Sequence, residues 1–370
     1  MFSSSNADVA YDNFILIFKN IFDKNFPLIY KSVNVNHDNK PYINNNFKEL
    51  IKQKNKIHKK YLKKPLTFCT QYKSIRNKLN LLIKQSKCKY YQDKLNNNYG
   101  NTKKTREVIN EILNRSSTQK INNSFNINNN LIDDPLTVVQ EFNNYYVNVG
   151  VNLAESIIDS TTSYVDYMGE RTDNELVFNN ISIDDVLLIV RNMKDSSAGY
   201  DDIPAKIVKI VINCIVEPLC HICNCSLSRG IFPSKLKIAK IIPIYKKDKK
   251  NCLENYRPIS VLPVFSKIIE KAISLQLIEY LEHNNLLNQT QFGFRTGRST
   301  VAAVLTLTDF ILNSFDKNEF TIGIFIDLKK AFETVDHHIL LQKLKYFGIT
   351  NISFDLFNSY LSNRLQYVFL

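Results

Sequence analysis

Asp327 is the residue of this chain best suited by its position to bind a metal ion. The stretch from Thr321 to Ile326 (TIGIFI) is apolar and β-prone, which predicts a buried strand ending on Asp327. A carboxylate at the end of a rigid strand can aim its charge into a cleft and bind a hard cation. Asp is also common where strands turn, so a plain turn residue or helix cap stays open.

Basic residues in two other segments could bind phosphate. They follow the apolar stretch 238–245, precede Pro258, or flank Gly297 in a predicted loop: Lys246, Lys247, Arg257, Arg295 and Arg298. Lys and Arg suit phosphate oxygens, and Arg can bind them through two parallel hydrogen bonds. Solvent-facing loop charge is the alternative for each residue taken singly.

A carboxylate, an aromatic residue five positions later (Phe332) and several phosphate-binding candidates match metal-dependent nucleotidyl transfer. In that chemistry two Mg²⁺ ions about 3.5–4 Å apart activate the attacking 3′-hydroxyl and stabilise the leaving pyrophosphate. Two such ions carry four positive charges, so Asp327 would need at least one more carboxylate.

A cysteine cluster offers a competing metal site. Cys214, Cys220, Cys223, Cys225 and His221 fall within twelve residues. Zinc needs about four converging ligands, usually two pairs separated by a loop, whereas these residues share one predicted helix. Cys behaves there as a small buried hydrophobe, which predicts core packing without a metal.

Composition places the charge unevenly. The net charge is +13, yet residues 46–120 hold 20 Lys or Arg against four Asp or Glu, a balance of +16. Such a segment favours a polyanionic partner, nucleic acid before a membrane surface, with a solvated lysine-rich arm as the alternative. No signal peptide or apolar run of about 20 residues is visible, so we expect an intracellular protein without a membrane span, in nucleus or cytoplasm.

The periodicity predicts an α+β chain. We expect helices over 47–95, 105–113 and 136–158, a helix capped by Ser182 and Asp185, and two helical stretches in 205–229 divided near Pro218. Farther on we expect a strand at 238–245, helices up to residue 273 and over 300–315, a helix capped by Asp336 and ended by Gly348, and a final helix leading into a strand. The predicted divisions are an N-terminal segment of unknown role (1–45), a basic helical region (46–115), an Asn-rich linker (116–135), a helical connector (136–195) and a chemistry-bearing part (196–370).

Six ordered blocks resemble the reverse transcriptases of non-LTR (LINE-type, jockey-like) retrotransposons. They are SSAGYDDIP at 196–204, GIFPSKLKIAKIIPIYKK at 230–247, NYRPISVLPVFSKIIEKAI at 255–273, QFGFRTGRST at 291–300, FIDLKKAFETVDH at 325–337 and SYLSNRLQYV at 359–368. The resemblance covers about 175 residues and implies a right-hand polymerase fold, with fingers followed by the first part of the palm.

The resemblance assigns roles residue by residue. Asp327 matches the first catalytic metal ligand for Mg²⁺, assisted by the carbonyl of Leu328, and Phe332 matches the aromatic that obstructs a 2′-hydroxyl. Lys246 and Arg257 match positions near the triphosphate, although Lys247 fits almost as well as Lys246, while Arg295 and Arg298 match the loop beside the primer–template. The implied partners are an RNA template, a DNA primer and deoxynucleoside triphosphates; the oligomeric state stays open.

Two departures from the family pattern matter. Glu333 stands where Asp is usual, and the sequence stops before the family's proline–glutamine–glycine–serine block and its aromatic–x–Asp–Asp hairpin. We therefore expect a reverse transcriptase fragment that is inactive as given. The alternatives are a non-catalytic nucleic-acid-binding relict of that fold and an RNA-dependent RNA polymerase. Phe332 argues against the last, since an RNA polymerase must admit the 2′-hydroxyl.

Overall fold

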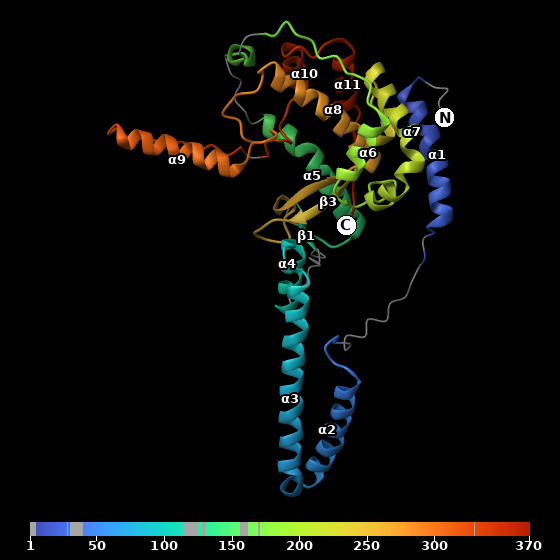
Figure 1. Ribbon diagram of the computed structural model, residues 1–370, viewed down its shortest axis with the longest axis vertical. Helices are drawn as coiled ribbons and strands as arrows, with labels where there is room; N and C mark the ends of the chain where they lie inside the picture. Colours follow the sequence, from blue (N-terminus) through green and yellow to red (C-terminus); the bar gives the residue numbers. More distant parts are fainter. Residues whose placement is uncertain are drawn as a thin grey trace. The chain divides into compact units, whose positions relative to one another are not determined.

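The computed structural model describes residues 5–27, 29, 40–113, 124–127, 130–155, 162–168, 171–328 and 330–370. These residues belong to two compact units (Figure 1). Unit 1 comprises Met1–Pro27 together with Ile121–Leu370, and unit 2 comprises Leu28–Lys120. The segment 1–45 that sequence treats as one piece is therefore divided between the units.

The elements of the two units follow one another along the chain as bounded here. Unit 2 holds α2 (Asn45–Lys63), α3 (Pro65–Asn96) and α4 (Thr102–Ile112). Unit 1 holds α1 (Ala7–Asn25), β1 (Phe125–Ile127), β2 (Asn130–Ile132), α5 (Pro135–Glu155), α6 (Ile183–Asn192), α7 (Ala205–Arg229), β3 (Ile238–Tyr245), β4 (Tyr256–Val261), α8 (Val264–His283), α9 (Thr300–Asp316), α10 (His337–Tyr346), α11 (Asn351–Leu361) and β5 (Leu365–Val368). Short 3₁₀ turns at Tyr164–Tyr167, Ser234–Lys237 and Leu253–Asn255 complete the described elements.

Unit 2 is a helical arm with little buried surface. Pro65 stands at the first position of α3, where its missing N–H costs nothing, so the helix predicted over 47–95 is two helices. Leu79 and Val108 are the buried residues among the described part of the three helices. Lysines occupy most of the remaining surface, as the charge balance of this region requires.

The main core of unit 1 is helical and draws on α1, α6, α7, α8 and α11. The Phe14 ring of α1 meets the Phe265 ring of α8 edge-on, with centroids 5.1 Å apart. Both rings are at most 2% exposed. The N-terminal helix, to which sequence gives no role, is thus part of this core.

Helix α7 is continuous through Pro218, so the predicted division there is wrong. A proline inside a helix removes one hydrogen bond and costs about 3 kcal/mol. Burial of Val216 and Leu219 on either side of it offsets that cost. By length and composition α7 is also the one helix among the described residues that could cross a membrane, a test that a core helix passes as well, and half of its most apolar window is buried here.

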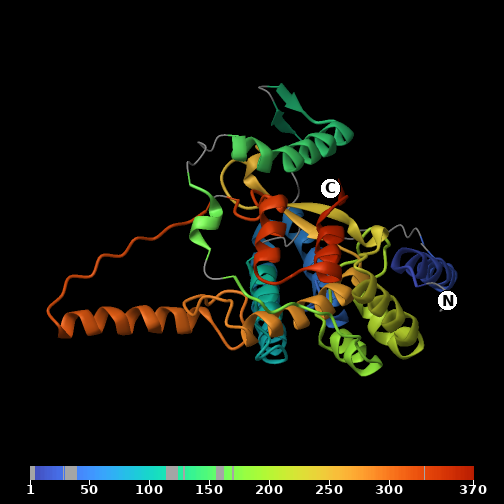
Figure 2. The ribbon, with the colours of Figure 1, turned by 90° about the horizontal axis from the view of Figure 1, so that it is seen from above.

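A three-stranded sheet carries the second core of unit 1 (Figure 2). Its order is β4-β3-β5, with β3 antiparallel to β4 and parallel to β5. Helix α5 and the β1–β2 hairpin pack on the sheet through Phe125, Phe142, Tyr146 and Tyr256. The hairpin lies inside the predicted linker 116–135, so that linker is shorter than expected; residues 116–123, 128 and 129 lie outside the described residues.

The strand predicted at Thr321–Ile326 is absent from the structure. Residues 319–328 are extended but unpaired, and Ile322, Ile324, Phe325 and Ile326 are each at least 83% exposed. Strand formation needs a hydrogen-bonding neighbour, and no described strand pairs with this segment. The segment leaves the end of α9, a long helix with one buried residue, Ser314 (Figures 1 and 2).

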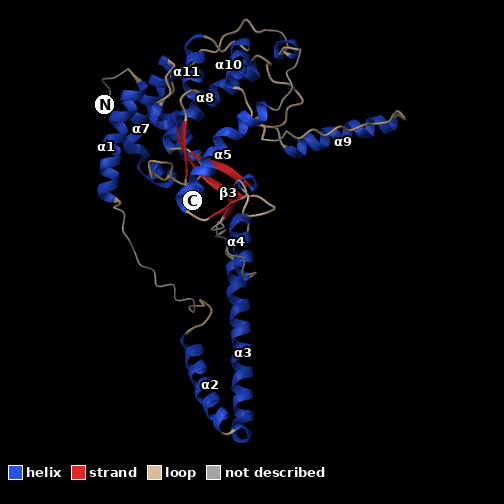
Figure 3. Ribbon diagram, turned by 180° about the vertical axis from the view of Figure 1, so that it is seen from behind, coloured by secondary structure: helices blue, strands red, loops and turns tan. Residues whose placement is uncertain are grey.

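The predicted helix ends are confirmed where they depend on neighbouring residues. Ser182 and Asp185 form a reciprocal capping box on α6, and the Asp336 side chain accepts from the N–H of Ile339 at the start of α10. Gly348, with φ of +77°, ends α10 as expected. Helices and strands are separated in Figure 3, which shows that the sheet is small against the helical mass around it. The mixed helix-and-sheet class is confirmed.

Candidate nucleotidyl-transfer site

Asp327 lies on the exposed, unpaired segment and is itself exposed. Leu328, whose carbonyl the sequence offers as a second ligand, is 71% exposed. Among the described residues no group of three or more His, Cys, Asp or Glu side chains is arranged to hold a metal ion. The structure therefore places Asp327 without acidic company.

Phe332 sits in a tight turn that follows Asp327. The turn is closed by backbone hydrogen bonds from the N–H groups of Glu333 and Thr334 to the carbonyl of Lys330, at 3.1 and 3.2 Å. The Phe332 ring is 79% exposed and meets the Phe294 ring at right angles, with centroids 6.2 Å apart. The structure thus brings the predicted gate residue beside the Gly/Arg loop.

The predicted triphosphate-binding residues lie at one end of the sheet. Arg257 is opposite Ile244 in the β3–β4 ladder, and the N–H of Lys246 donates to the carbonyl of Asn255 at 2.9 Å, which continues that register. Side chains alternate between faces along a strand, so Lys246 shares a face with Ile244 and Arg257, while Lys247 belongs to the other face. All three cationic residues are exposed.

Arg295 is committed to a structural ion pair. Its Nε and Nη2 donate to the two carboxylate oxygens of Glu282 at 2.8 and 2.5 Å, and its Nη1 donates to the carbonyl of Asn288 at 2.8 Å. The hydrogen bond from Arg295 lowers the pKa of Glu282. In this structure the guanidinium that sequence assigns to nucleic acid ties its loop to α8.

Arg298 is held less firmly. Its Nη2 donates to Oε1 of Gln289 at 3.2 Å, and its guanidinium carbon lies 5.4 Å from the centre of the Phe292 ring. A guanidinium stacked on an aromatic ring keeps other donors available. Of the two loop arginines, Arg298 retains the greater capacity to bind phosphate.

The cysteines of α7 are packed rather than clustered around a metal. Cys220, Cys223 and Cys225 are buried, and Cys214 is exposed. The Cys220 thiol donates to the carbonyl of Ile181 at 3.3 Å, and burial raises the pKa of Cys223 far above its ordinary value. The predicted core packing of Cys220 and Cys223 is confirmed.

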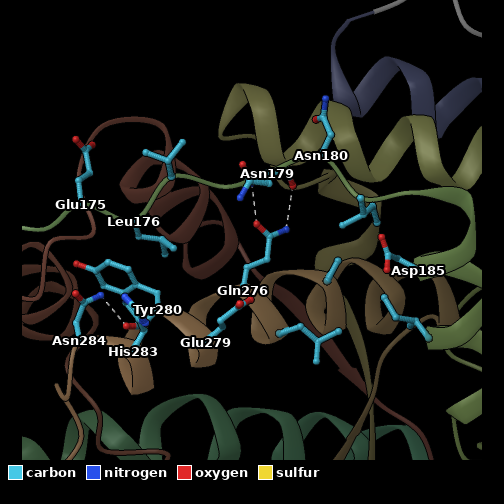
Figure 4. Close-up of a pocket in the computed structure, with 15 residues that line it drawn as sticks. Glu175, Leu176, Asn179, Asn180, Asp185, Gln276, Glu279, Tyr280, His283 and Asn284 are labelled. Carbon is cyan, nitrogen blue, oxygen red and sulfur yellow. Dashed lines mark hydrogen bonds between the residues drawn. The ribbon is translucent and has the colours of Figure 1, made fainter.

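A pocket of about 670 Å³ lies elsewhere, between the segment 175–181 and α8 (Figure 4). The Gln276 amide pairs with the backbone of Asn179, accepting from its N–H at 2.7 Å and donating to its carbonyl at 3.0 Å. The Asn224 amide of α7 pairs in the same way with Ile181. None of the site residues predicted from sequence lines this pocket.

The structure adds residues that sequence reasoning missed. The Lys330 ammonium donates to the Tyr145 hydroxyl of α5 at 2.7 Å, and Glu282 is the partner of Arg295. The motif FIDLKK draws attention to Lys330, but its partner lies 185 residues earlier in the chain. No local pattern could have found that pairing.

Comparisons with known proteins place this arrangement in a class. Residues 244–369 match the family model for reverse transcriptase (RNA-dependent DNA polymerase). The chain is 33% identical over 192 residues to a probable RNA-directed DNA polymerase from transposon BS of Drosophila melanogaster, covering 50% of this chain and 20% of that protein. It is 28% identical over 182 residues to the RNA-directed DNA polymerase from mobile element jockey of the same fly, covering 49% and 20%.

The chain thus contains a reverse transcriptase domain, and its resemblance to the non-LTR, jockey-like kind is confirmed. It spans about a fifth of the length of these relatives.

Proposed function

We propose that residues 196–370 are fingers and partial palm of an RNA-directed DNA polymerase of a non-LTR retrotransposon. The observation that carries the proposal is the match over 244–369, within which Asp327 and Phe332 stand in the family's order. An RNA template, a DNA primer and deoxynucleoside triphosphates are the proposed partners. The parent reaction would be attack of the primer 3′-hydroxyl on the α-phosphate, with pyrophosphate leaving.

Geometry supports separate roles for the proposed site residues. Lys246 and Arg257 share one face at one end of the sheet and would hold the triphosphate, and the register favours Lys246 over Lys247 for this role. Phe332 would exclude the 2′-hydroxyl. Arg298 would contact a backbone phosphate, and Arg295 would hold the shape of the loop through Glu282.

The divalent metal ions that the family uses are not accommodated by the described residues alone. Hard cations such as Mg²⁺ need several fixed oxygen ligands, and Asp327 is a single exposed carboxylate on an unpaired segment. The carbonyl of Leu328 adds an oxygen without adding charge. No catalytic step through a metal follows from this arrangement.

Primer extension tests the proposal. The 370-residue chain is mixed with a poly-ribonucleotide template, a DNA primer, Mg²⁺ and deoxynucleotides, and Asp327→Ala serves as the matched variant. We expect no extension by the chain as given, because loss of such electrostatic elements costs orders of magnitude in rate. A graft of residues 196–370 into the jockey polymerase should extend the primer and should lose activity with Asp327→Ala. An inactive but folded graft would contradict the proposal.

A second function, nucleic-acid binding without catalysis, is favoured by unit 2. Its helices carry cations beside aromatic rings: the Arg76 guanidinium lies 5.9 Å from the centre of the Tyr72 ring, and the Lys60 ammonium 5.7 Å from that of Phe68. The Tyr72 ring is stacked on Tyr61 at 5.2 Å. Cations and partly exposed rings on one surface suit the phosphates and bases of a single strand.

A further inference from the structure

We propose that Tyr145 of α5 is a positioning residue that fixes the turn bearing Phe332, and with it the end of the segment bearing Asp327. The proposal rests on the proposed polymerase function for its catalytic meaning. Its structural content concerns two contacts between α5 and the turn 330–334, and neither contact belongs to a motif that sequence singled out.

The helix that carries Tyr145 is firmly attached to the sheet. Phe142 is fully buried, and its ring centre lies 5.3 Å from that of Tyr256 in β4. The amide of Gln366 in β5 donates to Oδ1 of Asn143 at 3.2 Å. Because both ends of the sheet order are engaged, α5 is a rigid base on the same sheet that presents Lys246 and Arg257.

The first contact with the turn is made by a charge. The Lys330 ammonium donates to the Tyr145 hydroxyl at 2.7 Å and lies 4.4 Å from the centre of the same ring. A hydrogen bond to a charged group and a cation–π contact to one side chain together outweigh a neutral hydrogen bond.

The second contact is made by close backbone approach. Gly150 of α5 faces the carbonyl of Glu333, and a Cβ at position 150 would lie 2.1 Å from that oxygen. Real Cβ atoms do not approach an oxygen so closely, so only glycine lets the helix and the turn meet here. Tyr145 and Gly150 thus touch the two ends of a four-residue turn.

Held in this way, the turn has a defined conformation that its own sequence does not favour. Lys330 has φ of +51°, a left-handed conformation that is uncommon for a lysine and persists where surrounding contacts enforce it. Lys330 is two residues before Phe332 and three after Asp327. Anchoring it to α5 therefore sets the gate residue against the sheet end that carries the triphosphate-binding candidates.

Hydrogen–deuterium exchange on the full 370-residue chain tests the proposal. Tyr145→Ala is expected to raise amide exchange in residues 330–336 by about tenfold, the loss of one hydrogen bond to a charged group, and to leave β3, β4 and α8 unchanged. Tyr145→Phe, which keeps the ring, should raise it less. Tyr99→Ala, at a 95% exposed tyrosine of unit 2, is the matched control.

A spectroscopic readout separates positioning from general support. The chain contains no tryptophan, so Phe332→Trp introduces a single indole at the gate position. In this background Tyr145→Ala should lower the fluorescence anisotropy of the indole, whereas Tyr99→Ala should not. The effects of Tyr145→Phe and Lys330→Met on local exchange should be non-additive, because they remove the same contact.

Two results would overturn the proposal. One is unchanged exchange and unchanged indole anisotropy in Tyr145→Ala. The other is exchange raised equally across α5, the sheet and the turn, which would make Tyr145 a general packing residue. Gly150→Ala offers a second route to the same readout, since its Cβ would push the turn away from α5. None of these measurements needs catalysis or nucleic acid, so a failed polymerase assay and a failed positioning test remain distinguishable.

Discussion

The Arg295 guanidinium holds both carboxylate oxygens of Glu282 across thirteen residues of chain, and its side chain is only 6% exposed. An arginine in a Gly-rich loop suggests a free phosphate ligand from sequence alone. In the structure it joins the loop 288–299 to the end of α8. The two arginines of the loop should therefore respond differently to substitution.

We predict that Arg295→Lys loosens the loop and leaves the salt dependence of RNA binding unchanged, because lysine cannot reproduce the two-point pairing. Arg298→Ala should weaken RNA binding and reduce the slope of log K against log salt by about one. Fluorescence anisotropy of labelled RNA at increasing salt and hydrogen exchange of residues 288–299 measure the two effects. Equal salt slopes for Arg298→Ala and the parent chain would contradict the assignment.

Asp201 should make the stability of unit 1 depend on pH. Its side chain is 6% exposed, its Oδ2 has no hydrogen-bond partner among the described residues, and burial raises its pKa to about 6, while the ammonium of Lys19 nearby opposes the rise. The raised pKa means that the folded state binds a proton more tightly than the unfolded state. Stability is then fully present below pH 4 and is lost as the pH rises through about 6, by about 2–3 kcal/mol.

Asp201→Asn should remove this dependence, because an amide does not titrate. Urea unfolding of both proteins between pH 4 and pH 7.5 measures it, and the other titrating groups cancel in the difference. A difference between the two proteins that stays constant over this range would show that Asp201 is ionised throughout.

Unit 2 should bind RNA through phosphates with strong dependence on salt. Three exposed lysines follow one face of α2 at spacings of four and three: Lys52, Lys56 and Lys59. Replacing all three by Ala in the full chain should lower the slope of log K against log salt by up to about two for single-stranded RNA. Binding that is indifferent to salt would refute a phosphate-based interface.

A matched control keeps the total charge the same. Three exposed lysines of unit 1 are replaced by Ala in a second protein: Lys24, Lys206 and Lys317. This protein should keep the parent slope if binding is local to unit 2. An equal loss of slope in both proteins would instead indicate a general effect of net charge.

The cysteines should differ in reactivity according to burial. Cys88 and Cys214 are exposed, whereas Cys223 is buried and its thiol has a raised pKa, which suppresses the reactive thiolate. With iodoacetamide and peptide mass spectrometry, we expect Cys88 and Cys214 to be modified first and Cys223 only after unfolding. Early modification of Cys223, or stoichiometric zinc that is lost in Cys220→Ser, would contradict core packing of α7.

What the sequence by itself determined is local or carried by ordered motifs. Ser182 with Asp185, Asp336 and Gly348 mark helix ends because a cap is satisfied by neighbours within a few residues. The blocks containing Asp327 and Phe332 identified the polymerase family, because their spacing needs no knowledge of distant contacts.

Only the tertiary structure decided which of these residues meet. The stretch TIGIFI has every local feature of a strand, yet it is unpaired because a strand exists only beside another strand. Pro218 reads as a helix end until the burial of α7 on both sides of it is known. Phe14 on Phe265, Arg295 on Glu282 and Lys330 on Tyr145 join residues far apart in the chain, since packing and charge pairing depend on distance in space and not on distance in sequence.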